Sequence, residues 1–135
     1  MDRVVIESEA MRVGVLPAYG ARVASLFDKR TGREWIAAGG QSAGNGEDAV
    51  YGGDEAVGWD ECFPTVSPCD ATDTMWRRRL RDHGDLWGRA WSVDRQTPDA
   101  LATSYATAAF RFNRTLSVAG PALHARYAVE NRTAD

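Results

Sequence analysis

The sequence predicts an all-β protein, an antiparallel β-sandwich, and three observations lead to this prediction. Apolar and polar residues alternate with a period of two along several short stretches, as in half-buried strands. Turn-forming sequences rich in Gly, Pro, Asp and Asn separate these stretches. No segment shows a convincing helical period, so we expect short strands throughout.

The first part of the chain is predicted to form a β-meander. Strands are expected at Val4–Ile6, Met11–Leu16, Arg22–Phe27 and Glu34–Ile36. Met11, Val13 and Val15 share one face of the second stretch. Residues 28–32, Asp-Lys-Arg-Thr-Gly, have the length and the terminal glycine of a hairpin loop.

Residues 37–58 carry many glycines and few large apolar side chains, and predict a partly mobile loop. Gly39 and Gly44 have the spacing of a phosphate-binding loop, but Asn45 stands where that motif needs a lysine. Ala49 replaces the third glycine of a dinucleotide-binding motif. The segment therefore argues against a nucleotide site.

Strands are predicted again from residue 75 onward. They are expected at Met75–Leu80, Trp87–Val93, Ala100–Tyr105, Ala109–Val118 and Leu123–Val129. Phe110 and Phe112 share one face of their stretch. The last stretch alternates apolar and polar residues and predicts a half-buried strand. The turn-like residues 130–135 follow it, where a returning strand is expected.

Length, composition and charge limit the classes of function. A chain of 135 residues with 44% hydrophobic and 26% charged residues is expected to form one soluble core. The net charge of −3 gives no reason to expect nucleic acid or a membrane surface as a partner. No apolar run is long enough for a membrane helix. No secretory signal is visible, so we expect a cytoplasmic protein with reduced thiols at Cys62 and Cys69. Their spacing matches no zinc motif, and no metal is expected.

The densest chemistry lies in two short motifs. The first is 58–66, Gly-Trp-Asp-Glu-Cys-Phe-Pro-Thr-Val, and the second is 82–91, Asp-His-Gly-Asp-Leu-Trp-Gly-Arg-Ala-Trp. The stretch from the first motif to the second contains Trp59, Trp76, Trp87 and Trp91, four of the five tryptophans. Aromatic rings beside carboxylates suit a sugar, whose ring has apolar C–H patches and a polar hydroxyl edge.

Histidine can give and take protons near neutral pH, and the chain has two. His83 stands between Asp82 and Gly84, whose backbone freedom lets the imidazole point into a cleft. The plain alternative is a turn histidine bound to its neighbouring aspartates. His124 is interpreted as a solvent-facing strand residue.

The carboxylates Asp60 and Glu61 adjoin Trp59 and Phe63. On a strand the two acids would point to opposite faces, so at most one would face a given cleft. The alternative is an edge strand with a solvated acid and a buried tryptophan.

A basic cluster lies near Trp76, formed by Arg77, Arg78, Arg79 and Arg81. Such a cluster is typical of nucleic-acid binding, but surrounding acids balance its charge, and a charged strand face explains it as well.

These motifs resemble those of the aldose 1-epimerases, the galactose mutarotase-like superfamily. Residues 20–26 and 29–35 resemble the family's opening hairpins. Residues 59–65 and 82–87 look like its sugar-site motifs, and residues 127–131 resemble its Tyr-x-Val-x-Asn strand. The five matches follow the family's order over nearly the whole chain.

The resemblance implies a large antiparallel sandwich that binds a hexose and interconverts its α and β anomers without a cofactor. A base removes the proton of the anomeric hydroxyl, an acid protonates the ring oxygen, and the ring opens and recloses. By resemblance, His83 is the expected catalytic or orienting residue. The expected substrate-binding residues are Trp59, Glu61, Asp82 and Trp87, with Trp59 or Trp87 as the stacking platform.

The family's glutamate base and its second histidine match no residue of this chain. Residues 1–135 are therefore expected to be a single partial domain, the amino-terminal part of a galactose mutarotase-like sandwich. A missing carboxy-terminal half, or another subunit of a homo-oligomer, would complete it. Three functions stay open: an aldose 1-epimerase-type isomerase, a non-catalytic carbohydrate-binding remnant without the base, and a β-sandwich whose partner supplies the function.

Overall fold

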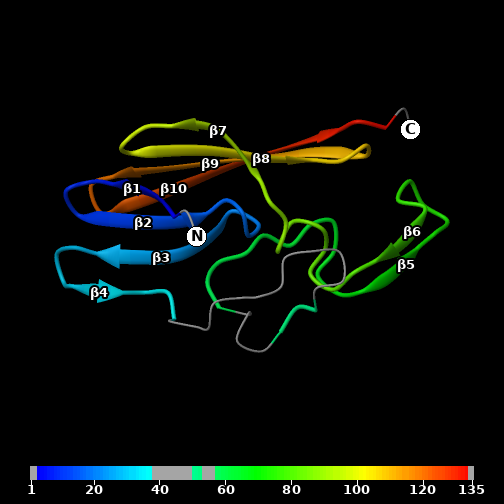
Figure 1. Cartoon of the computed structure of the whole chain (residues 1–135), viewed down its shortest axis with the longest axis horizontal. Coiled ribbons are helices and arrows are strands. Elements are labelled where there is room, and N and C mark those ends of the chain that lie inside the picture. The colour runs from blue at the N-terminus through cyan, green and yellow to red at the C-terminus, as the bar shows by residue number, and fades with distance from the viewer. Residues whose placement is uncertain (1–2, 38–49, 53–56, 134–135) are drawn as a thin grey trace.

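The computed structural model describes residues 3–37, 50–52 and 57–133, and within these ranges the chain forms ten strands and no helix (Figure 1). The strands pair into antiparallel sheets, which confirms the predicted fold class. In the described ranges there is accordingly no helix with the length and apolar character to cross a membrane. Most of the predicted loop 37–58 lies outside the described residues.

The first sheet is the predicted meander, with strand order β1-β2-β3-β4. Its strands are β1 (Val4–Glu7), β2 (Met11–Leu16), β3 (Arg22–Asp28) and β4 (Arg33–Glu34). The strand expected at 34–36 is shorter than predicted. The Glu34 carboxylate accepts the backbone N–H groups of Leu26 at 2.7 Å and Ile36 at 3.0 Å. The Glu34 side chain thus accepts hydrogen bonds that backbone carbonyls would accept if the strand continued. The pairing of β4 with β3 therefore ends at Glu34.

The second sheet has the order β10-β9-β8-β7. Its strands are β7 (Ser92–Gln96), β8 (Ala100–Ala106), β9 (Phe110–Ala119) and β10 (Ala122–Asn131). The strand predicted from Trp87 begins only at Ser92. Gly84 and Gly88 have φ values of 74° and 65°, so the chain before β7 turns instead of extending.

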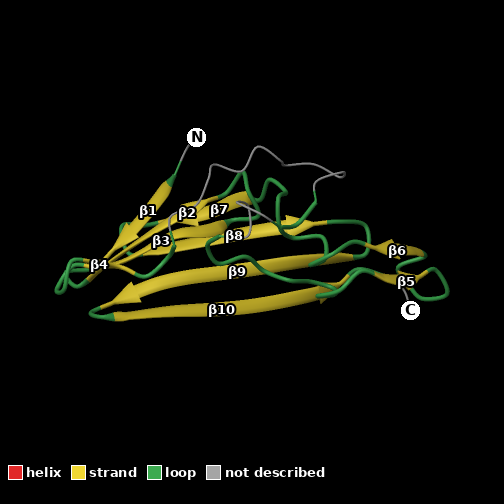
Figure 2. Cartoon of the chain, turned by 90° about the horizontal axis from the view of Figure 1, so that it is seen from below, coloured by secondary structure: helices red, strands yellow, loops and turns green. Residues whose placement is uncertain are grey.

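A small hairpin stands apart from the two sheets (Figure 2). It pairs β5 (Cys69–Ala71) with β6 (Arg78–Leu80). The strand predicted at 75–80 loses its first half to a turn, which Arg77 N–H closes by donating to Thr74 C=O at 3.1 Å. Arg77, with a φ of 50°, ends that turn. The strand β5 was not predicted, because its three residues carry no readable alternation.

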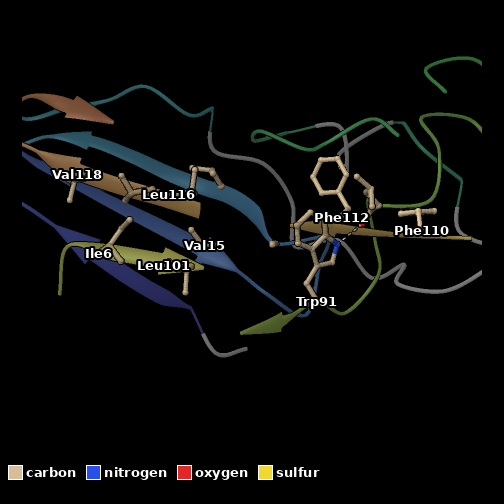
Figure 3. Packing of buried hydrophobic residues seen from close by; sticks show 12 residues of the cluster. Ile6, Val15, Trp91, Leu101, Phe110, Phe112, Leu116 and Val118 are labelled. Atoms are coloured by element: carbon tan, nitrogen blue, oxygen red, sulfur yellow. Dashed lines mark hydrogen bonds between the residues drawn. The ribbon is translucent and has the colours of Figure 1, made fainter. Parts of the chain in front are cut away.

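The core lies between the two sheets (Figures 2 and 3). The first sheet contributes Ile6, Val13 and Val15, and the second contributes Leu101, Phe110, Phe112, Leu116 and Val118. Each fully buried aliphatic side chain stabilises the fold by about 1.5–3 kcal/mol. At one end of this core, Trp91 meets Phe112 edge to face at 5.6 Å, and its Nε1 donates to Leu86 C=O at 3.0 Å (Figure 3).

The predicted half-buried character of the last strand is wrong. Along β10, Tyr127 and Val129 are 42% and 49% exposed, although they lie on the core side, opposite Arg114 and Phe112. The first sheet contacts the second through β1 against β8 and β9. β10 lies at the edge of its sheet, and the first sheet does not cover its core-side face within the described residues.

Candidate functional site

The two sequence motifs fold into one unit, because residues 81–89 turn back against the first motif. Gly84 pairs with Phe63 in a parallel bridge, and Asp85 N–H donates to Phe63 C=O at 2.7 Å. His83 N–H donates to Val66 C=O at 2.8 Å. His83 and Gly84 both have left-handed φ values, of 58° and 74°. This conformation is unusual for a residue with a side chain, and it fixes the direction in which the imidazole leaves the backbone.

The imidazole of His83 lies against an aromatic ring. It stacks on Tyr51 with ring centroids 3.7 Å apart and an interplanar angle of 17°. Its Nδ1 lies 3.0 Å from Oδ1 of Asp82 and is shielded from solvent, but the two atoms are not aligned for a hydrogen bond. The His83 side chain remains 27% exposed. Tyr51 therefore covers one face of the imidazole and Asp82 lies beside Nδ1, while another part of the ring is exposed to solvent.

Trp87 is buried and contacts both Asp82 and Tyr51. It is 2% exposed, its Nε1 donates to Asp82 C=O at 2.8 Å, and its ring meets Tyr51 edge to face at 5.2 Å. The Arg81 guanidinium lies 4.2 Å from the centroid of the same indole. The structure thus brings the predicted residues His83, Asp82 and Trp87 together, with Trp87 in the supporting layer and Tyr51 facing the imidazole.

Asp60 of the first motif is buried in an ion pair with Arg22. The Arg22 Nε donates to both carboxylate oxygens, at 2.9 and 3.1 Å, and Nη2 lies 2.8 Å from Oδ2. The two side chains are 7% and 4% exposed. Burial raises the pKa of the Asp60 carboxyl, and the Arg22 guanidinium offsets part of that shift. This acid anchors the motif to β3, where Trp59 and Val23 also exchange backbone hydrogen bonds of 3.0 Å.

Glu61 is bound on the other side, by residues of β9 and β10. Its Oε1 accepts bonds from Arg114 Nη1 at 2.9 Å and from the Tyr127 hydroxyl at 2.8 Å. The Arg114 side chain is fully buried; its Nη2 donates to Ala21 C=O, and its guanidinium lies 5.5 Å from the Trp91 ring centroid. Burial and the bond to Glu61 raise the pKa of the Tyr127 phenol. The expected strand is absent, because residues 60 and 61 lie outside the strands, but the two acids do point to different partners, Asp60 to Arg22 and Glu61 to Arg114.

The predicted residues therefore fall into two groups. His83, Asp82 and Trp87 gather around Tyr51, and Glu61 joins Tyr127 beside Trp59. Burial raises the pKa of Tyr51, and the charges of Asp60 and Asp82 add to that shift, so the first motif lies within electrostatic range of the histidine group.

Three residues of this region were not predicted from the sequence. Arg114 could have been found, because it shares its parity along β9 with Phe110, Phe112 and Leu116 and so must face the core. Arg22 begins a predicted strand, but nothing in the sequence around it indicates that it pairs with Asp60. Tyr51 lies in the glycine-rich stretch, where no periodic pattern marks it.

Within the described residues, no three His, Cys, Asp or Glu side chains gather as metal ligands. Cys62 and Cys69 are both free and exposed in this structure.

No protein-family model matches this chain, and no curated protein matches it. A solved structure with a similar fold is the X-ray structure of a galactose mutarotase related enzyme from Lactobacillus acidophilus, with a TM-score of 0.72 and 15% sequence identity. The match covers 96% of this chain and 43% of the other, so this chain spans less than half the length of that enzyme. The likeness shows that the antiparallel sheets of this chain have a galactose mutarotase-like fold.

Proposed function

We propose that this chain provides the histidine part of a hexose site and takes part in the interconversion of α and β sugar anomers, the reaction of an aldose 1-epimerase. The observation that carries the proposal is the placement of His83. In a galactose mutarotase-like fold, a left-handed turn presents this imidazole stacked on Tyr51, beside Asp82 and partly open to solvent. A partly shielded imidazole near aromatic rings and carboxylates suits proton transfer to a bound sugar.

In this proposal His83 acts on the ring oxygen of the sugar. A protonated imidazole donates a proton to that oxygen while a base removes the proton of the anomeric hydroxyl. The C1–O5 bond breaks, the open aldehyde rotates about C1–C2, and closure on the other face returns both protons. Asp82, 3.0 Å from Nδ1, stabilises the charged ring during this exchange. Proton transfer alone completes the reaction, so no cofactor enters the proposal.

Among the described residues, the acids of the first motif do not supply the base. Asp60 pairs with Arg22 and Glu61 with Arg114, so both acids of the first motif already hold an arginine. A carboxylate from outside the described residues, in this chain, a second segment or a second subunit, would have to face His83. This requirement agrees with a chain that spans 43% of the similar enzyme.

The same two ion pairs favour an alternative function, a carbohydrate-binding protein without catalysis. In that case a sugar would bind against Trp59 and Tyr51 and form hydrogen bonds with His83 and Asp82, and no proton would be exchanged. The two functions share the binding site and differ in the rate of anomer exchange.

Polarimetry of freshly dissolved α-glucose and α-galactose tests the proposal, with sugar binding measured in parallel by calorimetry. We expect the chain to accelerate mutarotation once the segment or subunit that supplies the base is present, and His83→Ala to reduce that acceleration by tenfold or more. His124→Ala is the matched control, because His124 is exposed on β10, and it should leave the rate unchanged. Sugar binding without acceleration supports the alternative, and equal loss in both variants contradicts the role of His83.

A further inference from the structure

We propose that a basic pocket near the β5–β6 hairpin binds a small phosphate monoester that carries a ring. The pocket has a volume of about 750 Å³ and lies between that hairpin, residues 81–89, the β8–β9 turn and Thr133. Figure 2 shows the hairpin at the same end of the molecule as the C-terminus. This volume is within the usual range for small-molecule sites, about 300–1,000 Å³.

Positive charge dominates the wall of the basic pocket. Among the residues that the structure describes, five arginines line it, Arg77, Arg78, Arg79, Arg81 and Arg89, together with one carboxylate, Asp85. Asp85 is engaged by the guanidinium of Arg78. Asp70 lies opposite Arg79 across the β5–β6 pair, but its carboxylate also accepts the N–H of Thr72 at 3.0 Å. Among these described side chains the arginines outnumber the acids, so the wall favours an anion.

The position of one of these arginines is fixed by the backbone. Arg81 donates from Nε to Gly84 C=O at 2.7 Å and from Nη2 to Trp87 C=O at 2.5 Å. Burial lowers the pKa of Arg81, and the like charge of Arg89 lowers it further. Arg81 and Arg89 therefore bring like charges close together in the wall of the basic pocket, where a bound anion would be attracted to both. Guanidinium groups also match phosphate oxygens in geometry, with paired N–H donors.

Two aromatic side chains also line the wall. Trp76 and Tyr105 line the basic pocket, and Trp76 is held against Phe110 at 5.7 Å and against Phe63 at 6.1 Å. A ring that is fixed in this way offers a flat apolar contact at little entropic cost. The combination favours a phosphate on a small ring-shaped body over inorganic phosphate alone.

The basic pocket is separate from the proposed sugar site. Its lining includes none of His83, Trp59, Glu61, Asp82 and Trp87. Arg81 precedes His83 and Asp85 follows it in the same turn, and both line the basic pocket, whereas His83 does not. The inference therefore stands whether or not the chain catalyses mutarotation.

Calorimetric titration of the full chain with phenyl phosphate tests this inference, with inorganic phosphate and phenol as reference ligands at constant ionic strength. The pocket variant is Arg77→Gln with Arg79→Gln, two exposed arginines of the wall. The control variant is Arg95→Gln with Arg126→Gln, which removes the same charge from exposed positions on β7 and β10. Thermal unfolding of both variants verifies that they fold.

We expect saturable binding of phenyl phosphate, weaker binding of inorganic phosphate, and none of phenol. The pocket variant should weaken phenyl phosphate binding by roughly tenfold or more, because each lost guanidinium removes charge-assisted hydrogen bonds. The control variant should change it less than about twofold, because the two removed charges lie outside the pocket. Absence of saturable binding, or equal weakening in both variants, would overturn the site. Equal affinity for phenyl phosphate and inorganic phosphate would overturn the role of the aromatic wall.

Discussion

Replacing Gly84 by alanine should separate the two motifs that form the histidine site. A Cβ at this position would lie 2.2 Å from the carbonyl oxygen and 2.4 Å from the carbonyl carbon of Phe63. Both are backbone atoms and cannot rotate aside. The left-handed φ of +74° costs an alanine about 1 kcal/mol, and the overlap adds about 2 kcal/mol or more. We therefore expect Gly84→Ala to lower the free energy of unfolding by about 3 kcal/mol or more.

Gly32 offers a matched control in the loop between β3 and β4. Its φ of +70° is nearly the same, but nothing lies within 4 Å of the position that a Cβ would take. Gly32→Ala should therefore cost only the backbone component of about 1 kcal/mol.

Urea unfolding followed by tryptophan fluorescence measures both variants. In thermal unfolding, each 1 kcal/mol corresponds to roughly 3–5 °C for a chain of this size. Equal losses in the two variants would refute the reasoning, since they would show that contact with Phe63 contributes nothing beyond the φ angle.

Two further predictions concern the buried network around Glu61. Arg114→Met should lower the free energy of unfolding by about 3–5 kcal/mol, because it leaves the Glu61 carboxylate without its cation. Adding Glu61→Gln should recover part of this loss, as measured by urea unfolding. Strictly additive losses in the two variants would contradict the coupling between Arg114 and Glu61. The raised pKa of Tyr127 means that the folded state holds the phenolic proton more tightly than the unfolded state. The resulting stability is present below about pH 10 and is lost as the pH rises above it. Thermal unfolding across this range should show a steeper decline for the natural chain than for Tyr127→Phe, and identical slopes would count against the bond to Glu61.

The sequence predicted the fold well wherever a strand has one face in the core. Along β9, alternation placed Phe110 and Phe112 on one face, and both are buried. The same rule failed for β10, because a strand's pattern shows which face is apolar and not whether another layer covers it. Tyr127 and Val129 have the expected parity and are nevertheless exposed.

The site was predictable in composition and less so in geometry. The residues His83, Asp82 and Trp87 are close in sequence, so a single turn brings them together. Tyr51 lies more than thirty positions earlier, and only the fold places it on the imidazole. The arginine partners of Asp60 and Glu61 come from β3 and β9, and local patterns carry no information about such long-range ion pairs.

The long edge strand of the second sheet, β10, affects how this protein associates with other chains. Every second residue of β10 directs its peptide N–H and C=O away from β9, which creates a template onto which a foreign strand can add. Arg126 and Glu130 stand along this border with opposite charges. An antiparallel strand that adds at this edge pairs more favourably when it places opposite charges beside Arg126 and Glu130, and like charges there weaken the pairing.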